Sequence, residues 1–182
     1  MKEKVFSLAL PLTLKELTRV LVFISLSLLS FFIPFSLGHP QWLVGTIVNT
    51  CLFLTAVYLP KRYYIPLIIL PSLGVLARGL LFGPFTLFLV YFLPFIWLGN
   101  FILILIFKNS FLRFNYLLSV FLAATTKFLL LIITANIYFN FHLVPSIFVQ
   151  TMGLNQLATA LAGGLISWVI YEQYNSRNKK TA

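Results

Sequence analysis

The chain has 182 residues, of which 60% are hydrophobic and 9% are charged, and its mean hydropathy is +1.00. A soluble domain has roughly 25% charged residues, so this composition excludes a soluble enzyme and a disordered tail. The single cysteine excludes a disulfide scaffold. Lys and Arg number 13 against 3 acidic residues. Most of these basic residues lie between long apolar runs and do not form one basic face. This pattern favours a membrane protein over a nucleic-acid-binding one.

Six apolar runs follow one another along the chain, and a membrane-spanning helix needs about 20 mostly apolar residues. The third run is weak, because it is short and interrupted by Pro66, Pro71 and Gly74. The ten-residue alternation of barrel strands is missing from the sequence. We therefore expect one domain over residues 1–182, an all-α polytopic bundle of six transmembrane helices. The predicted spans are Leu17–Phe35, Trp42–Leu59, Ile65–Ala77, Thr86–Phe107, Tyr116–Ile137 and Pro145–Tyr171.

The basic residues predict the orientation, because short cytoplasmic loops are enriched in Lys and Arg. With six spans, Arg78 alone faces the outside and Lys127 lies within a span, so both termini are predicted to be cytoplasmic. The third span is needed for this pattern, since without it Lys108 and Arg113 change sides. The membrane is predicted to be the plasma membrane. Eleven basic residues fall on the inner side: Lys2, Lys4, Lys15, Arg19, Lys61, Arg62, Lys108, Arg113, Arg177, Lys179 and Lys180.

Polar residues inside the spans are costly in lipid and therefore indicate function. At 1.5 Å per residue, Asn49 lies about 10 Å below the outer end of its span, and Lys127 about 15 Å below. Gln156 lies about 16 Å below the start of the sixth span, with Asn155 one residue above it. Three helices thus place polar groups at similar depths, and Arg78 lies over the same side. We expect an outward-opening pocket that binds substrate through these residues.

The outer connections contribute further candidate binding residues. His39 and Gln41 belong to an apolar connection with glycine and proline, which is typical of backbone folded into a bundle rather than solvated. Trp42, Phe82 and Phe85 are candidates to cover an aromatic part of a ligand. The alternative for the buried amides is that they hold helices together by hydrogen bonds. Arg78 can also be an interface anchor, and the histidines can have structural roles.

Several functions are disfavoured by missing motifs. His39 and His142 lack carboxylate or thiol neighbours, so no metal site is expected. No predicted span contains Asp or Glu, the residues that a proton- or sodium-coupled carrier usually needs. The phosphate-binding loop motif of ATPases and the usual hydrolase motifs do not occur. The sequence therefore predicts neither an enzyme nor a resident cofactor.

The layout resembles the S-components of energy-coupling factor (ECF) transporters, which are single-domain membrane proteins of similar length. The resemblance rests on His39-Pro40-Gln41, Gly45 through Asn49, Gly79 through Thr86, Pro94 through Asn100, and Asn155-Gln156 through Gly164. It implies six helices, cytoplasmic termini, and a vitamin or similar micronutrient bound near the outer face. It also implies a separate transmembrane coupling subunit and cytoplasmic ATPases as partners. That family carries an Ala-x-x-x-Ala-type motif on its first helix, whereas the first span here offers only serines as small residues.

The sequence thus predicts a substrate-capture subunit of an ATP-driven, ECF-type uptake transporter. Its ligand is expected to be a small polar or anionic nutrient. The alternative is a membrane scaffold or assembly subunit that does not transport, in which the polar residues only hold helices together. A third and weaker hypothesis is an enzyme that acts on lipid head groups with His39 and Arg78. The lack of a nucleophile–base pair disfavours it.

Overall fold

The computed structural model describes residues 14–37, 39–82 and 86–181, and it describes the backbone alone at residues 15, 80–82, 86–87 and 178–181. This part of the chain is helical and contains no strand. Six helices have 18 residues or more, with a short 3-10 turn and a short helix between them. The elements are α1 (Leu14–Ser36), α2 (Gln41–Tyr58), η1 (Lys61–Tyr63), α3 (Tyr64–Phe82), α4 (Thr86–Phe111), α5 (Tyr116–Asn140), α6 (Ile147–Met152) and α7 (Leu154–Thr181).

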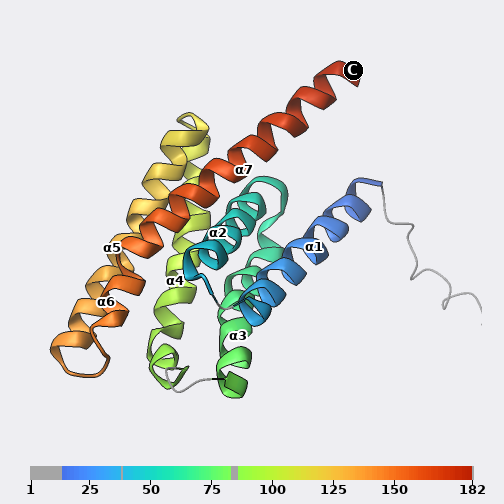
Figure 1. The fold of residues 1–182 in the computed structure, drawn as a ribbon. Coiled ribbons are helices and arrows are strands. Elements are labelled where there is room, and N and C mark those ends of the chain that lie inside the picture. Colours follow the sequence, from blue (N-terminus) through green and yellow to red (C-terminus); the bar gives the residue numbers. More distant parts are fainter. Residues whose placement is uncertain (1–13, 38, 83–85, 182) are drawn as a thin grey trace, which may run out of the picture.

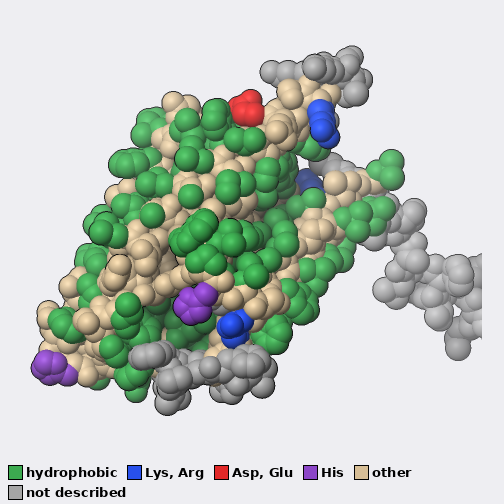
Figure 2. Space-filling model, viewed as in Figure 1, with side chains coloured by type: hydrophobic (Ala, Val, Ile, Leu, Met, Phe, Trp, Pro, Cys, Tyr) green, Lys and Arg blue, Asp and Glu red, His purple; other side chains and the backbone are tan. Residues whose placement is uncertain are grey.

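Five stretches are long and apolar enough to cross a membrane. They are α2, α5, most of α1 and of α4, and Ile147–Arg177, which joins α6 to α7. A chain with this many spanning helices is a multi-pass membrane protein. Figure 2 shows hydrophobic side chains over most of the visible face, while the charged side chains in view lie toward its two ends. This distribution is the one that a lipid environment requires.

The helices form one bundle in which long helices that follow one another in the chain are antiparallel, whereas α2 and α7, and likewise α1 and α3, pack side by side in parallel. Helix α2 packs against α7 on one side and α1 on the other, while α4 packs against α5 and α3. The start of α1 and the end of α7 lie toward the same end of the bundle (Figure 1). The connections α1–α2, α3–α4 and α5–α6 therefore gather at the opposite end.

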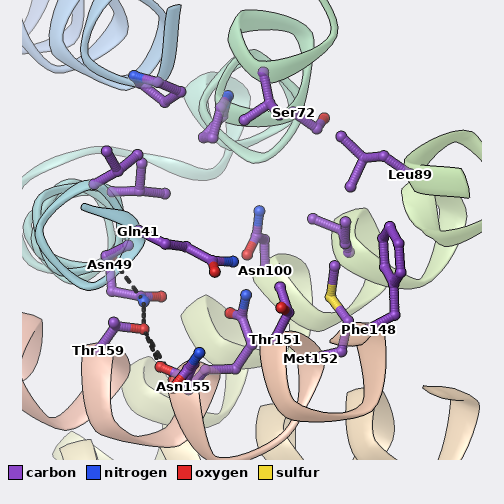
Figure 3. Close-up of a pocket in the computed structure, with 18 of the residues that line it drawn as sticks. Gln41, Asn49, Ser72, Leu89, Asn100, Phe148, Thr151, Met152, Asn155 and Thr159 are labelled. Atoms are coloured by element: carbon purple, nitrogen blue, oxygen red, sulfur yellow. Dashed lines mark hydrogen bonds between the residues drawn. The ribbon is translucent and has the colours of Figure 1, made fainter. Parts of the chain in front are cut away.

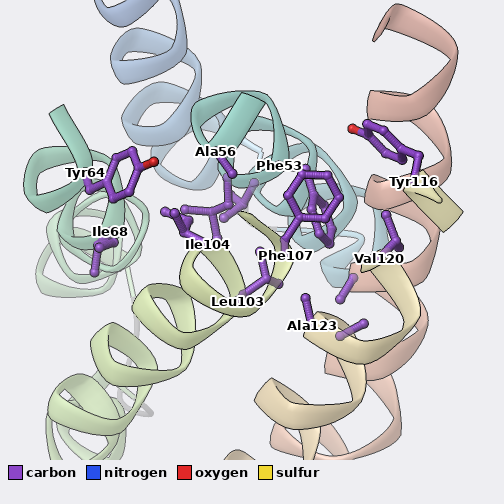
Figure 4. Close-up of a cluster of buried hydrophobic side chains, with 14 residues drawn as sticks. Phe53, Ala56, Tyr64, Ile68, Leu103, Ile104, Phe107, Tyr116, Val120 and Ala123 are labelled. Atoms are coloured by element: carbon purple, nitrogen blue, oxygen red, sulfur yellow. The ribbon is translucent and has the colours of Figure 1, made fainter. Parts of the chain in front are cut away.

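A large buried cluster closes the bundle at the end that carries the η1 turn and the α4–α5 connection (Figure 4). Phe107 of α4 contacts Phe53 of α2 and Tyr116 of α5 edge to face, with ring centroids 5.1 and 5.0 Å apart. The Tyr116 hydroxyl donates a hydrogen bond to Ser167 Oγ at 2.9 Å. Because these contacts join α2, α4, α5 and α7, that end of the bundle is filled with packed side chains.

The third helix is longer than the sequence predicts. Helix α3 runs from Tyr64 to Phe82 through Pro71, whereas the predicted span ended at Ala77. Residues 78–82, which lie between the third and fourth predicted spans, therefore belong to this helix. Gly74 explains part of this, because a Cβ there would clash with the Phe31 carbonyl oxygen of α1. The glycine that weakened the prediction is therefore a site of close packing between helices.

The sixth predicted span is broken in two. Helix α6 ends at Met152 and α7 begins at Leu154, with Gly153 between them at φ −95° and ψ −117°. The helix α7 then continues ten residues past the predicted end at Tyr171. Broken helices in membrane proteins survive where the interrupted backbone is buried in protein or lines a cavity. Gly153 is buried beneath Ile132 of α5.

Candidate functional site

A cavity of about 680 Å³ opens within the bundle, toward the end where the α1–α2 connection lies. Ligand pockets typically have volumes of about 300–1,000 Å³, so this cavity is of the size that holds a small organic molecule. Every long helix contributes to its wall. Most of the wall is apolar, and the polar side chains that line it are His39, Gln41, Asn49, Ser72, Arg78, Asn100, Lys127, Thr151, Asn155, Gln156 and Thr159.

Lys127 of α5 and Asn49 of α2 meet in the buried part of this wall. The Lys127 ammonium donates a hydrogen bond to Asn49 Oδ1 at 2.8 Å, and the two side chains are 3% and 1% exposed. Asn49 Nδ2 donates to Gly45 O at 2.9 Å and to Thr159 Oγ1 at 3.2 Å. Thr159 in turn donates to Asn155 O at 2.8 Å (Figure 3). One chain of hydrogen bonds therefore joins α5, α2 and α7.

Glycines allow α2 and α7 to approach closely enough for this network. A Cβ at Gly163 would lie 2.7 Å from Thr46 O and 2.8 Å from Thr50 N. A Cβ at Gly45 would lie 3.0 Å from the Thr159 side chain. The small residues of α7 around Gly163 thus pack inside the bundle, as small residues do at contacts between membrane helices,.

Lys127 has an amide partner where a buried cation usually has a carboxylate. The three acidic residues of the chain are Glu3, Glu16 and Glu172, so none lies between residues 17 and 171. An ammonium has three N–H donors, and one of them is used by Asn49. Burying an ammonium without a counter-charge is costly. This wall of the cavity is therefore suited to a group that accepts hydrogen bonds or carries negative charge.

Asn100 of α4 is a second buried amide, which was not among the binding residues predicted from the sequence. Its side chain is 2% exposed, and Nδ2 donates to Ile68 O of α3 at 3.1 Å. Its Oδ1 is buried and accepts no hydrogen bond among the described residues. A buried acceptor left unpaired costs about 1–3 kcal/mol. Figure 3 shows this side chain at the cavity, with Gln41 reaching toward it.

The mouth of the cavity carries Arg78, His39 and Gln41. Arg78 Nη1 donates to Phe35 O at 3.1 Å and to Ser36 O at 2.7 Å. Both carbonyls belong to the last turn of α1, where a helix leaves such groups without partners inside it. Arg78 therefore ties α3 to the end of α1 at the rim, in addition to lining the cavity.

Of the eight substrate-binding residues predicted from the sequence, seven line this one cavity: Lys127, Arg78, Asn49, Gln156, Asn155, His39 and Gln41. Trp42 does not line it, and its side chain is 65% exposed. The Phe82 side chain and Phe85 lie outside the described residues. Asn155 and Gln156 reach the cavity because α7 begins directly after the break at Gly153.

Sequence reasoning missed Ser72, Thr151 and Thr159 as well as Asn100. Ser72 accepts a hydrogen bond from Trp97 Nε1 at 2.6 Å and donates to Ile69 O at 2.8 Å, so its hydroxyl is already paired. Thr159 sits in the small-residue run of the last helix, which pointed only to packing. Asn100 was detectable, because it is an amide within an otherwise apolar span.

No group of three metal-ligating side chains occurs in the described part of the chain. The polar wall of the cavity is built from amides, hydroxyls, an ammonium, a guanidinium and one imidazole. This set provides several hydrogen-bond donors and little negative charge, so it is chemically suited to organic ligands that carry acceptors. Comparison with protein-family models, with curated proteins and with solved structures finds no match to this chain.

Proposed function

We propose that this protein is the substrate-capture subunit of an ATP-driven, ECF-type micronutrient uptake transporter. In this proposal it lies in the plasma membrane with both termini in the cytoplasm, and the cavity opens to the outside. The observation that carries the proposal is the cavity itself, which places the buried Lys127 among amides and apolar groups. A small polar or anionic nutrient would bind there.

Lys127 would act as the main recognition group of this site. One of its N–H groups is held by Asn49 Oδ1, which fixes the ammonium at the cavity wall. Its other donors would bind a carboxylate, phosphate or carbonyl oxygen of the nutrient. Charge-assisted hydrogen bonds in a desolvated site are roughly twice as strong as neutral ones. A ligand with such a group would also supply the charge compensation that the protein does not provide.

Transport would depend on other subunits. The sequence contains no phosphate-binding loop, and most of the described chain is in helices of the bundle. ATP hydrolysis would therefore belong to separate cytoplasmic ATPases, joined to this chain by a transmembrane coupling subunit. Of the serines that α1 offers as small residues for contact with such a subunit, Ser25 is exposed and Ser30 is buried in the bundle.

The direct test is mass spectrometry of small molecules bound to the purified protein. We expect a copurified anionic or polar metabolite with the wild type, and its loss from Lys127→Met, which keeps the length of the side chain but removes the ammonium. Thr126→Val is the matched control, because Thr126 is the exposed neighbour on the same helix and its hydroxyl donates to the Leu122 carbonyl of its own helix. Equal occupancy in all three proteins, or none in any, would refute the proposal.

A scaffold function remains the second candidate, and one observation favours it. The Lys127–Asn49–Thr159 network joins three helices, which is also what purely structural hydrogen bonds do. A scaffold would retain its partner proteins in Lys127→Met and would copurify with no metabolite. Affinity purification of the two variants from the native host, followed by identification of bound proteins and metabolites, separates the two functions.

A further inference from the structure

The unpaired oxygen of Asn100 carries information about the ligand that Lys127 does not. Asn100 is buried and lines the cavity, and its Oδ1 has no hydrogen-bond partner among the described residues. Buried side-chain oxygens in native proteins nearly always accept at least one hydrogen bond. An acceptor held at the wall of a ligand-sized cavity indicates a donor on the molecule that fills it.

The orientation of the Asn100 amide follows from its neighbours. The Ile68 carbonyl can only accept, so the group facing it at 3.1 Å must be Nδ2,. Rotating the amide would place two oxygens against each other, so Oδ1 lies on the other side of the amide from the Ile68 carbonyl, and Figure 3 shows this side chain at the cavity. The adjoining Gly99 packs against Lys127, with its Cβ position 3.4 Å from Lys127 Cγ. Gly99 therefore lets α4 pack closely against Lys127, and Asn100, the next residue, lines the same cavity as this lysine.

We infer that Asn100 selects ligands that carry an N–H donor, so that the nutrient has an amide- or lactam-type N–H together with the acceptor group that Lys127 binds. This inference rests on the proposed function. An amide edge offers a donor and a carbonyl side by side, and Gln41, which reaches toward Asn100 (Figure 3), has an amide of its own for that carbonyl,. Permanently cationic molecules are excluded, because Lys127 and Arg78 line the same cavity.

The test compares ligands that differ only at the N–H. The probes are the lactam carboxylates orotate and hydantoin-5-acetate, each paired with its N-methyl derivative in which both ring N–H groups are methylated and no N–H donor remains. Benzoate and tricarballylate serve as carboxylates without N–H, and choline as a permanent cation. Affinities for the detergent-purified protein are measured from thermal shift at several probe concentrations. We expect at least one lactam carboxylate to bind at least about tenfold more tightly than its N-methyl derivative, since loss of the donor leaves a buried acceptor unpaired.

A variant tests the same contact from the protein side. Asn100→Leu keeps the approximate volume and removes the acceptor, so the parent probe should lose about tenfold in affinity while the N-methyl derivative is unchanged. Thr126→Val should bind both as the wild type does. Should Asn100→Leu fail to fold, the comparison of probes on the wild type still decides, because it needs no variant.

The results that overturn the inference are distinct from those that overturn the proposed function. Equal binding of a probe and its N-methyl derivative, binding of choline, or binding confined to benzoate and tricarballylate rules out selection by Asn100. If those carboxylates still bind and Lys127→Met abolishes their binding, the proposed capture function stands. Binding of no probe overturns the inference, while a metabolite that copurifies in a Lys127-dependent manner would still support capture.

Discussion

The Lys127 ammonium lies 2.8 Å from Asn49 Oδ1 and donates a hydrogen bond to it, which joins α5 to α2 through two residues that are 78 positions apart in the sequence. Amide–ammonium pairs are weaker than ion pairs, because the amide carries no net charge to offset that of the lysine. The cost of burying the cation is therefore only partly offset by the protein. Lys127 is therefore expected to affect both the stability of the protein and the binding of a ligand.

We expect the loss of Asn49 and the loss of Lys127 to change the free energy of unfolding by different amounts. Asn49→Leu should lower the free energy of unfolding by about 2–3 kcal/mol, because it leaves a buried cation without an acceptor. Lys127→Met should cost less, since it removes the cation together with its desolvation cost. Cys51, the single cysteine of the chain and 2% exposed, provides the measurement, because a thiol-reactive dye labels it only when the bundle opens on heating. A larger loss for Lys127→Met than for Asn49→Leu would contradict this reading.

Close packing of α2 against α7 predicts a strong effect of one added methyl group. Gly163→Ala would place Cβ 2.7 Å from Thr46 O, which forces the helices apart and should destabilise the protein by about 1–3 kcal/mol. Gly99→Ala is the matched control, because its nearest contact would be an ordinary 3.4 Å to Lys127 Cγ. It should be neutral or stabilising by up to about 1 kcal/mol, since alanine favours helix over glycine. The same dye-labelling measurement applies, and equal effects at both positions would refute the packing argument.

The orientation proposed for the bundle predicts which loops can be labelled from outside. Phe141 and Leu112 are 72% and 83% exposed and lie at opposite ends, after α5 and after α4 respectively. In intact cells, a membrane-impermeant maleimide should label Phe141→Cys in a Cys51→Ser background, but not Leu112→Cys in the same background. Leu112→Cys should react only after permeabilisation. The reverse pattern would show that the termini face outward.

Arg78 is expected to act on stability as well as on binding. Arg78→Gln removes the charge-assisted hydrogen bonds to Phe35 O and Ser36 O, and should lower the free energy of unfolding by about 1–2 kcal/mol. Arg78→Lys should retain part of that free energy, because an ammonium at a helix C-terminus still pairs with its carbonyls. Thermal unfolding of the three proteins measures this difference. An unfolding temperature unchanged in Arg78→Gln would limit this arginine to ligand contacts.

Much of the helix order was predictable from apolar runs alone. All six predicted spans begin within three residues of an observed helix, since burial of backbone groups in lipid forces each apolar run to become a helix. The break at Gly153 was not predicted, because the apolar run continues across it without a change in hydropathy. The length of α3 was missed because Pro71 and Gly74 read as interruptions, whereas packing of Gly74 against Phe31 makes the glycine favourable there.

The sequence by itself determined the class of the protein, the order of its helices and the similar positions of Asn49 and Lys127 along their helices, because length along a helix converts directly into distance. Only the tertiary structure decided which face of each helix turns inward. In helices that are apolar all round, hydropathy does not select a face, so rotation depends on close contacts such as those at Gly45 and Gly163. Those contacts bring Asn49 to Lys127, turn Trp42 outward, and leave the oxygen of Asn100 unpaired at the cavity.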